Sequence, residues 1–217
     1  MQFSSIDIYV VIDTFLLLLI GIGPKIALVP FLEVTANMDA PTKARVIRKM
    51  ITTAAVTALL LVVFGGILTR LLHFSPGALG IAGGLILFII SAYMILGPGD
   101  QETRHRTMTD KDPMQVAVFP LAVPYLLNPA GIVVLVTVSA EAQAGSFGLL
   151  ATVVGLLIVV IAIDVVVFRF ANRVSAHLDQ SRMLITEKVF GFLLAALGVQ
   201  LVLNGLADVG VIHLSGH

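Results

Sequence analysis

The chain has 217 residues, of which 58% are hydrophobic and 12% are charged, and its mean hydropathy is +1.05. Soluble domains carry about 25% charged residues, so this composition excludes an ordinary soluble protein and indicates one domain solvated by a lipid bilayer. Thirteen basic and thirteen acidic residues cancel, which leaves no basic excess for binding a nucleic acid. Cysteine is absent, which excludes disulfides, thiolate catalysis and cysteine metal ligands.

Six apolar runs are long enough to cross a bilayer, because a transmembrane helix needs about 20 mostly apolar residues. We therefore predict an all-α, multi-pass membrane protein that forms one integral membrane domain over residues 1–217. The start of the first run contains Asp7 but no Lys or Arg, unlike a cleaved signal peptide, so it is predicted to be a mature helix. The six predicted helices cover about Asp7–Glu33, Ala44–Leu72, Pro76–Leu96, Val116–Ser139, Phe147–Phe168 and Lys188–Val209.

Basic residues fall mainly on one side of these helices. Lys and Arg in short loops mark the cytoplasmic side of a membrane protein. The connections after the first, third and fifth helices hold eleven of the thirteen basic residues, the opposite side holds only Arg70, and Lys25 lies within the first helix. This distribution predicts that both termini lie outside the cytoplasm.

The first and fourth helices contain sequences that interrupt a helix, because proline lacks an N–H and clashes with the preceding turn. The first interruption is Gly21-Ile22-Gly23-Pro24, and the second is Asn128-Pro129 followed by Gly131. Freed backbone groups are tolerated at membrane depth only where protein or a wet cavity satisfies them. Both breaks are predicted near mid-membrane, and the half-helix N-termini beyond them suit a carboxylate. Ordinary kinks are the alternative, since Gly and Pro are common in transmembrane helices.

The two halves of the chain also resemble each other weakly. The two breaks are related by an offset of 105 residues. At an offset of 108, three positions of the third helix coincide with positions of the sixth: Gly83, Leu85 and Gly97 match Gly191, Leu193 and Gly205. Three helices per half would invert the second copy, an architecture that recurs in secondary transporters. We therefore predict two inverted three-helix repeats, at about residues 7–97 and 116–209, with chance similarity as the alternative.

These features predict a substrate site between the two breaks. Asn128 would offer hydrogen-bond donors and an acceptor, with a helix–helix hydrogen bond as the alternative. Lys25 could attract a carboxylate or snorkel to the cytoplasmic surface. The candidate substrate-binding residues are Gly21, Gly23, Pro24, Asn128, Pro129 and Gly131, with Gln200 of the sixth helix as an outer candidate.

Two acids lie inside predicted helices, and intramembrane acids are candidates for function. Asp13 is the candidate for proton coupling, whereas Asp164 has an interfacial pair with Arg169 or Arg173 as its simpler explanation. The five histidines lie at helix ends or in loops, which disfavours a Ser–His hydrolase and a buried metal site. We therefore expect no enzyme activity, no catalytic residues, no bound metal and no cofactor.

Several segments along the chain together form a recognisable sequence pattern. They are Leu18–Met38 (LLIGIGPKIALVPFLEVTANM) with Asp39-Ala40-Pro41, then Pro76–Leu85, Phe119–Pro124, Gly191–Leu194, Gly198–Gln200 and Asn204-Gly205. In this order they resemble the MarC family of bacterial inner-membrane proteins. The resemblance implies a six-helix inner-membrane protein related to the LysE-type exporters, with small neutral amino acids as substrates attributed to some members. The family's breaks usually read Asn-Pro first and Gly-Pro second, the reverse of this chain, and many members carry an arginine where Gly80 stands.

The combined pattern predicts a secondary transporter of a small solute, either an exporter or a proton-coupled carrier, with a small neutral amino acid as the favoured substrate. A channel-like or regulatory membrane protein without alternating access is the alternative. The expected partners are the solute and the bilayer, with no nucleic acid, and a homo-oligomer is left open.

Overall fold

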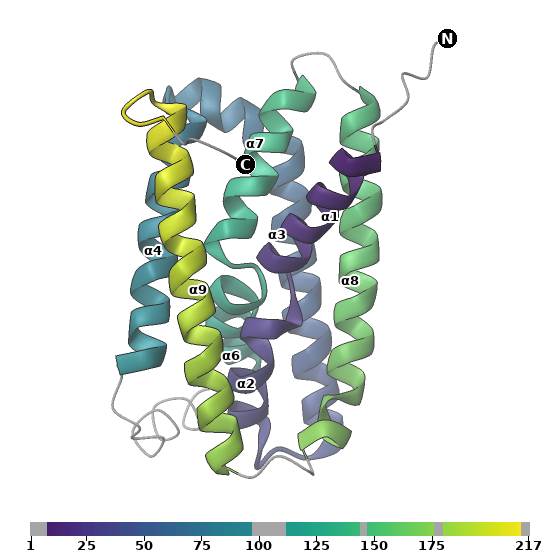
Figure 1. Cartoon of the computed structure of the whole chain (residues 1–217). Helices are drawn as coiled ribbons and strands as arrows, with labels where there is room; N and C mark the ends of the chain where they lie inside the picture. Colours follow the sequence, from purple (N-terminus) through teal and green to yellow (C-terminus); the bar gives the residue numbers. More distant parts are fainter. Residues whose placement is uncertain (1–7, 97–111, 144–146, 176–179, 214–217) are drawn as a thin grey trace.

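The computed structural model describes residues 8–96, 112–143, 147–175 and 180–213. The regular elements within these ranges are all helical (Figure 1), which confirms the predicted all-α class. In chain order they are α1 (Ile8–Gly21), α2 (Pro24–Thr35), α3 (Ala40–Leu72), α4 (Pro76–Leu96), α6 (Pro113–Val116), η1 (Ala117–Leu126), α7 (Pro129–Gln143), α8 (Phe147–Ser175) and α9 (Gln180–Asp208).

Four segments are long and apolar enough to cross a membrane: α3, α4, Leu150–Ala171 within α8 and Lys188–Asp208 within α9. They correspond to the second, third, fifth and sixth predicted helices. The first predicted helix is divided into α1 and α2, and the fourth is divided into Pro113–Leu126 and α7. The described residues therefore contain four candidate spans and shorter helices at the two predicted breaks, while the count of six spans stays a prediction.

Several helices extend beyond the apolar runs that predicted them. α3 begins at Ala40 rather than near Ala44, with Pro41 in its first turn, where the missing N–H of proline costs nothing. α8 continues to Ser175 rather than ending near Phe168, and α9 begins at Gln180 rather than near Lys188. Apolarity marks the part of a helix that faces lipid, and polar side chains can continue the same helix into water.

The irregular segment η1 interrupts the fourth helix before its main break. Phe119 and Val123 leave the helical region, with φ/ψ of −137°/121° and −135°/125°, and each precedes a proline. The residue before a proline avoids helical backbone because the proline ring crowds it. The segment up to Leu126 is therefore an irregular π-helical stretch rather than a regular α-helix.

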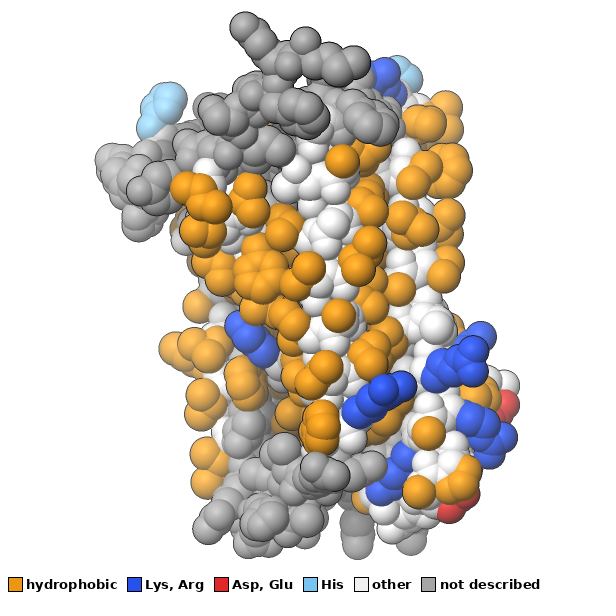
Figure 2. All heavy atoms as spheres, turned by 90° about the vertical axis from the view of Figure 1, so that its right-hand side faces the viewer, with side chains coloured by type: hydrophobic (Ala, Val, Ile, Leu, Met, Phe, Trp, Pro, Cys, Tyr) orange, Lys and Arg blue, Asp and Glu red, His pale blue; other side chains and the backbone are white. Residues whose placement is uncertain are grey.

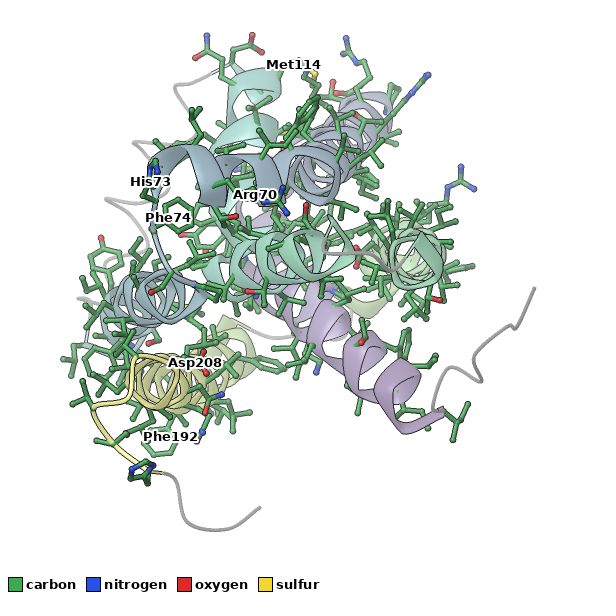
Figure 3. All side chains as sticks on the ribbon, turned by 90° about the horizontal axis from the view of Figure 1, so that it is seen from above. Arg70, His73, Phe74, Met114, Phe192 and Asp208 are labelled. Carbon is green, nitrogen blue, oxygen red and sulfur yellow. The ribbon has the colours of Figure 1, made fainter. Side chains whose placement is uncertain are left out.

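α7 occupies the centre of the bundle. Seen from the end where Arg70, His73 and Asp208 lie, α4 and α9 lie side by side on one side of α7, and α8 lies on the other (Figure 3). α7 packs against α1, α3, α4 and α8. One of these contacts is a hydrogen bond of 2.9 Å from the Gly66 N–H of α3 to the hydroxyl of Ser139, which fixes the upper half of α7.

α4 and α9 pack antiparallel through glycines. A Cβ added to Gly84 would lie 2.5 Å from the carbonyl oxygen of Gly198, and one added to Gly205 would lie 2.5 Å from that of Gly77. One heptad further along, Gly191 lies against Ser91, which is fully buried. Small residues let membrane helices approach until their backbones touch, so these positions explain why the two helices pair so closely.

The outer surface suits a bilayer. Figure 2 shows hydrophobic side chains along the middle of one face, with most of its visible Lys and Arg side chains near the lower end. Exposed apolar residues of this kind include Val56, Leu60 and Phe64 of α3, whereas Arg48 and Lys49 are exposed near the start of that helix. An apolar surface this extensive requires lipid or a partner to cover it.

Candidate functional site

The two helix breaks meet in the structure. α1 ends at Gly21 and α2 begins at Pro24, while η1 ends at Leu126 and α7 begins at Pro129. The extended residues between the half-helices pair with each other, because Ile22 and Leu127 form an isolated antiparallel bridge. The N–H of Asn128 donates to the carbonyl of Gly21 at 2.9 Å. Each break therefore satisfies backbone groups freed by the other, as membrane depth requires.

Gly21 and Gly131 bring the two backbones into direct contact. A Cβ on Gly21 would lie 2.6 Å from the Gly131 nitrogen, and a Cβ on Gly131 would lie 2.7 Å from the Gly21 carbonyl carbon. Both residues are buried. Only glycine allows backbones to approach this closely, so the space between the breaks is closed in this conformation.

Asn128 joins the two breaks through its side chain, which is 1% exposed. Its Nδ2 donates to the carbonyl of Ile20 at 2.7 Å, and its Oδ1 accepts from the N–H of Gly131 at 3.1 Å. The second bond caps the first turn of α7, a typical role of asparagine at a helix start. The helix–helix hydrogen bond considered from the sequence is thus present. The amide group of asparagine has two N–H donors, and only one of them is used in the bond to Ile20. Contact of Asn128 with a substrate therefore stays a prediction.

The N-terminus of α2 has no such cap. Gly23 occupies the N-cap position with extended backbone (φ −143°, ψ 158°) and provides no side-chain hydrogen bond. Pro24 follows at the first helical position and lacks an N–H. Lys25 is exposed and makes no hydrogen bond or ion pair within the part of the chain that the structure describes. Positive charge at the start of α2, from the helix dipole and from Lys25, is therefore left without an anion.

The structure brings together Gly21, Pro24, Asn128, Pro129 and Gly131 from the predicted site, with Gly23 in the extended link between α1 and α2. It does not bring Gln200 into the crossing. That side chain is exposed on α9 and donates to the Oδ1 of Asn204 at 2.8 Å. The proton-coupling candidate Asp13 lies in α1, but its side chain is outside the described residues.

Asp164 is the residue that sequence reasoning undervalued. Its side chain is 1% exposed, and neither carboxyl oxygen has a hydrogen-bond partner among the described residues. The expected pair with Arg169 is wrong because Arg169 points to the exposed side of α8, and the side chain of Arg173 lies outside the described residues. Helical spacing could have revealed this burial, since Asp164 continues a stripe of apolar residues formed by Val153, Leu157, Val160 and Phe168.

These apolar spans, the lipid-compatible surface and the crossing of two interrupted helices define a multi-pass α-helical membrane protein. The described residues contain no group of three or more His, Asp or Glu side chains placed to hold a metal ion. The chain belongs to the MarC family of integral membrane proteins, whose family model matches residues 8–209.

Relatives of this chain cover nearly its whole length. A protein named UPF0056 membrane protein from Pyrococcus horikoshii is 27% identical over 201 residues, which is 92% of this chain and 94% of the relative. YvbG of Bacillus subtilis, also called a UPF0056 membrane protein, is 27% identical over 95% of this chain and 96% of its own length. The inner membrane protein MarC of Escherichia coli is 22% identical over 94% and 97%. No solved structure matches the chain.

Proposed function

We propose that this protein is a secondary transporter of a small solute, with a small neutral amino acid as the favoured substrate. The observation that carries the proposal is the crossing of two interrupted helices at Ile22 and Leu127. Interrupted helices that meet inside a membrane protein form the substrate sites of many secondary transporters. A purely structural kink needs no second kink opposite it, so the pairing favours a binding site.

The internal repeat belongs to this proposal. Each interrupted helix resumes at a proline, Pro24 in one half and Pro129 in the other, and the residues that pair lie two positions before these prolines. The antiparallel contact of α4 with α9 would be the second meeting point of two inverted halves. We propose that the halves move relative to each other about these two contacts, which both depend on glycine.

The solute's carboxylate would bind at the start of α2. This helix has no side-chain cap, whereas the first turn of α7 is capped by Asn128. Free backbone N–H groups and the positive end of a helix dipole attract anions, and Lys25 adds a full charge in the same turn. Asn128 and the glycines would line the opened space, and Gln200 is kept as an outer candidate that the solute passes.

Admission of a solute requires the two breaks to separate, because Gly21 and Gly131 fill the space between them in this conformation. We propose that the end of the bundle with the basic start of α3 faces the cytoplasm, following the positive-inside rule. In that orientation α2 leads from the crossing to the cytoplasmic surface, and α1 leads to the opposite surface.

Counterflow in proteoliposomes tests the proposal. Vesicles loaded with an unlabelled neutral amino acid should accumulate the labelled compound transiently, because a carrier exchanges the two, whereas the channel-like or regulatory alternative gives no exchange. Alanine, serine and other small neutral amino acids are the first compounds to test, with empty liposomes as the blank. A Gly155→Ala variant is a suitable control protein, since a Cβ there meets nothing within 4 Å. Absence of counterflow for every small solute tested would overturn the proposal.

A further inference from the structure

The inner face of α8 carries one acid in an otherwise apolar stripe. Val153, Leu157, Val160, Phe168 and Ala171 are each at most 2% exposed, and Asp164 lies in the same stripe at 1%. Asp164 lies seven residues before the end of the membrane span at Ala171, or ~10 Å inside it, and ~21 Å from the other end at Leu150. The acid is therefore deep inside the membrane part of the protein and turned away from lipid.

Asp164 has no hydrogen-bond partner among the residues that the structure describes, and this holds for both of its carboxyl oxygens. α8 packs against α1, α2, α3 and α7. The titratable or charged residues described on those helices are Lys25 and Glu33 of α2 and Lys43, Arg45, Arg48, Lys49 and Arg70 of α3. The side chains of Tyr9 and Asp13 of α1 and of Glu141 of α7 lie outside the described residues. None of the described groups reaches the carboxyl of Asp164.

Asp164 lies at the level of the proposed solute site. The rings of Phe31 on α2 and Phe168 on α8 make an edge contact, with centroids 5.2 Å apart. Both helices run from the upper to the lower end of the molecule in Figure 1. Asp164 lies four residues before Phe168, and Ala27 lies four residues before Phe31, a rise of ~6 Å in each helix. Asp164 is therefore at the same level as Ala27. Ala27 is fully buried in the first turn of α2, directly after the break.

An ionised carboxylate in such a place would be very unfavourable, because a buried charge needs a counter-ion or several hydrogen bonds. Asp164 has neither within the described part of the chain, so we expect its carboxyl group to hold a proton while α8 packs against α2. A neutral acid in a membrane interior is costly as well, and intramembrane acids commonly mark proton pathways. A leucine, whose side chain has the same number of heavy atoms as that of aspartate, would occupy this position without any polar atom to bury.

We propose that Asp164 is a proton-binding site that is loaded in this conformation and discharges when α2 moves away from α8. On opening, water reaches the carboxyl group, the O–H bond breaks, the proton passes to a water oxygen as hydronium, and the carboxylate remains. Repacking of α8 against α2 requires the carboxylate to take a proton back. The proton site stands independently of the transported solute, whereas its use in coupling rests on the proposed function.

Isotope-edited infrared spectroscopy of the full chain in liposomes tests the proton site. With ¹³C in the aspartate side-chain carboxyl, a protonated acid gives a label-sensitive C=O band separate from that of ionised carboxylates. The wild type should show this band at neutral pH, Asp164→Asn should lose it, and Asp208→Asn should keep it, because Asp208 is exposed at the end of α9. If the wild type has no such band, the proposal is wrong, whether or not any variant folds.

Retention of the band in folded Asp164→Asn would equally overturn the proposal, because another aspartate would then hold the proton. Asp164→Leu provides a second variant that should lose the band and fold at least as stably as the wild type, since it removes a buried polar group without a partner. Loss of the band in both variants supports the assignment.

Gradient-driven transport tests the coupling role. Asp164→Asn should lose uptake or efflux driven by a pH gradient while keeping counterflow, because exchange of solute needs no net proton transfer. Asp208→Asn is the matched control and should keep gradient-driven transport, because Asp208 is exposed at the end of α9. Equal gradient-driven transport by Asp164→Asn and the wild type would overturn the coupling role. If the wild type shows no counterflow, the proposed function fails together with coupling, and the infrared band alone decides the proton site.

Discussion

Each of the two helix breaks is followed by a helix that begins with a proline, but the N-termini of these two helices are capped differently. Before α7, the side chain of Asn128 caps the helix, and that same side chain bonds back to the carbonyl of Ile20 in α1. Before α2, Gly23 has no side chain to offer, and Lys25 follows as an exposed cation. One break is closed by its own residues, and the other leaves helix-end positive charge unsatisfied.

This difference would assign the structural role to one break and the binding role to the other, whereas two symmetric breaks would share both roles. The capped start of α7 holds the crossing together at the centre of the bundle, because α7 also packs against α3 and α4. The uncapped start of α2 is the place where a carboxylate would gain most, since the N-cap residue Gly23 provides no side-chain acceptor for the first N–H groups of this helix. The asymmetry therefore predicts a structural role for one break and a binding role for the other, and four substitutions test it.

Gly131→Ala should have the largest effect. The added Cβ would overlap the backbone of Gly21, which cannot move aside as a flexible side chain could. We expect the free energy of unfolding to fall by about 3 kcal/mol or more, measured by thermal unfolding in detergent. Gly155→Ala in α8 is the control, because nothing lies within 4 Å of its Cβ, and it should gain about 0.5–1 kcal/mol from improved helix propensity. Equal stability of the two variants would show that the breaks do not touch.

Asn128→Leu should come second. It leaves the buried carbonyl of Ile20 and the N–H of Gly131 without partners. Each unsatisfied group costs about 1–3 kcal/mol, so the two together cost about 2–6 kcal/mol. We expect the lower end of this range, below the loss in Gly131→Ala, because side chains can relax around the freed groups, and the loss is read from the unfolding midpoint. Asn204→Leu makes the same change at an exposed position of α9 and should alter stability far less. A stable Asn128→Leu protein with weakened solute binding would reverse the comparison and make this break the binding one.

Lys25→Gln should leave stability unchanged, because the side chain is exposed and makes no described contact. The affinity for an amino acid should fall about 10- to 100-fold, since a hydrogen bond to a charged group contributes about 1.5–3 kcal/mol and each factor of ten in affinity corresponds to about 1.4 kcal/mol. Binding is measured by competition in the counterflow assay. Lys49→Gln, an exposed change on α3, should bind normally. Wild-type affinity in Lys25→Gln would remove the uncapped break from the site.

Gln200→Leu should have the smallest effect. It removes a side-chain bond to Asn204 one turn away on the same helix, and such pairs contribute about 0.2–0.5 kcal/mol. We expect an affinity within about threefold of the wild type, because even the full ~0.5 kcal/mol would correspond to only about 2.3-fold at about 1.4 kcal/mol per factor of ten. A large loss of affinity without loss of stability would instead extend the site from α2 to α9.

The sequence alone determined the membrane class, the all-α fold, the family and the position of both breaks. These properties follow from local chemistry. Apolar runs of sufficient length require lipid, and proline interrupts a helix wherever it stands inside one, so Gly23-Pro24 and Asn128-Pro129 could be located without a structure. The ends of the helices were less predictable, because α8 and α9 continue as polar helix where apolar patterning stops.

Only the tertiary structure decided what these residues contact. Ile22 pairs with Leu127 in an antiparallel bridge, and the backbones of Gly21 and Gly131 are in direct contact. The Asn128 amide donates a hydrogen bond to the carbonyl of Ile20. The tertiary structure also turned Asp164 inward, where no described residue is a hydrogen-bond partner, although the sequence had favoured a pair with a nearby arginine. Helical spacing defines which residues share a face, but which helix covers that face depends on packing between segments some hundred residues apart, and no local pattern encodes that choice.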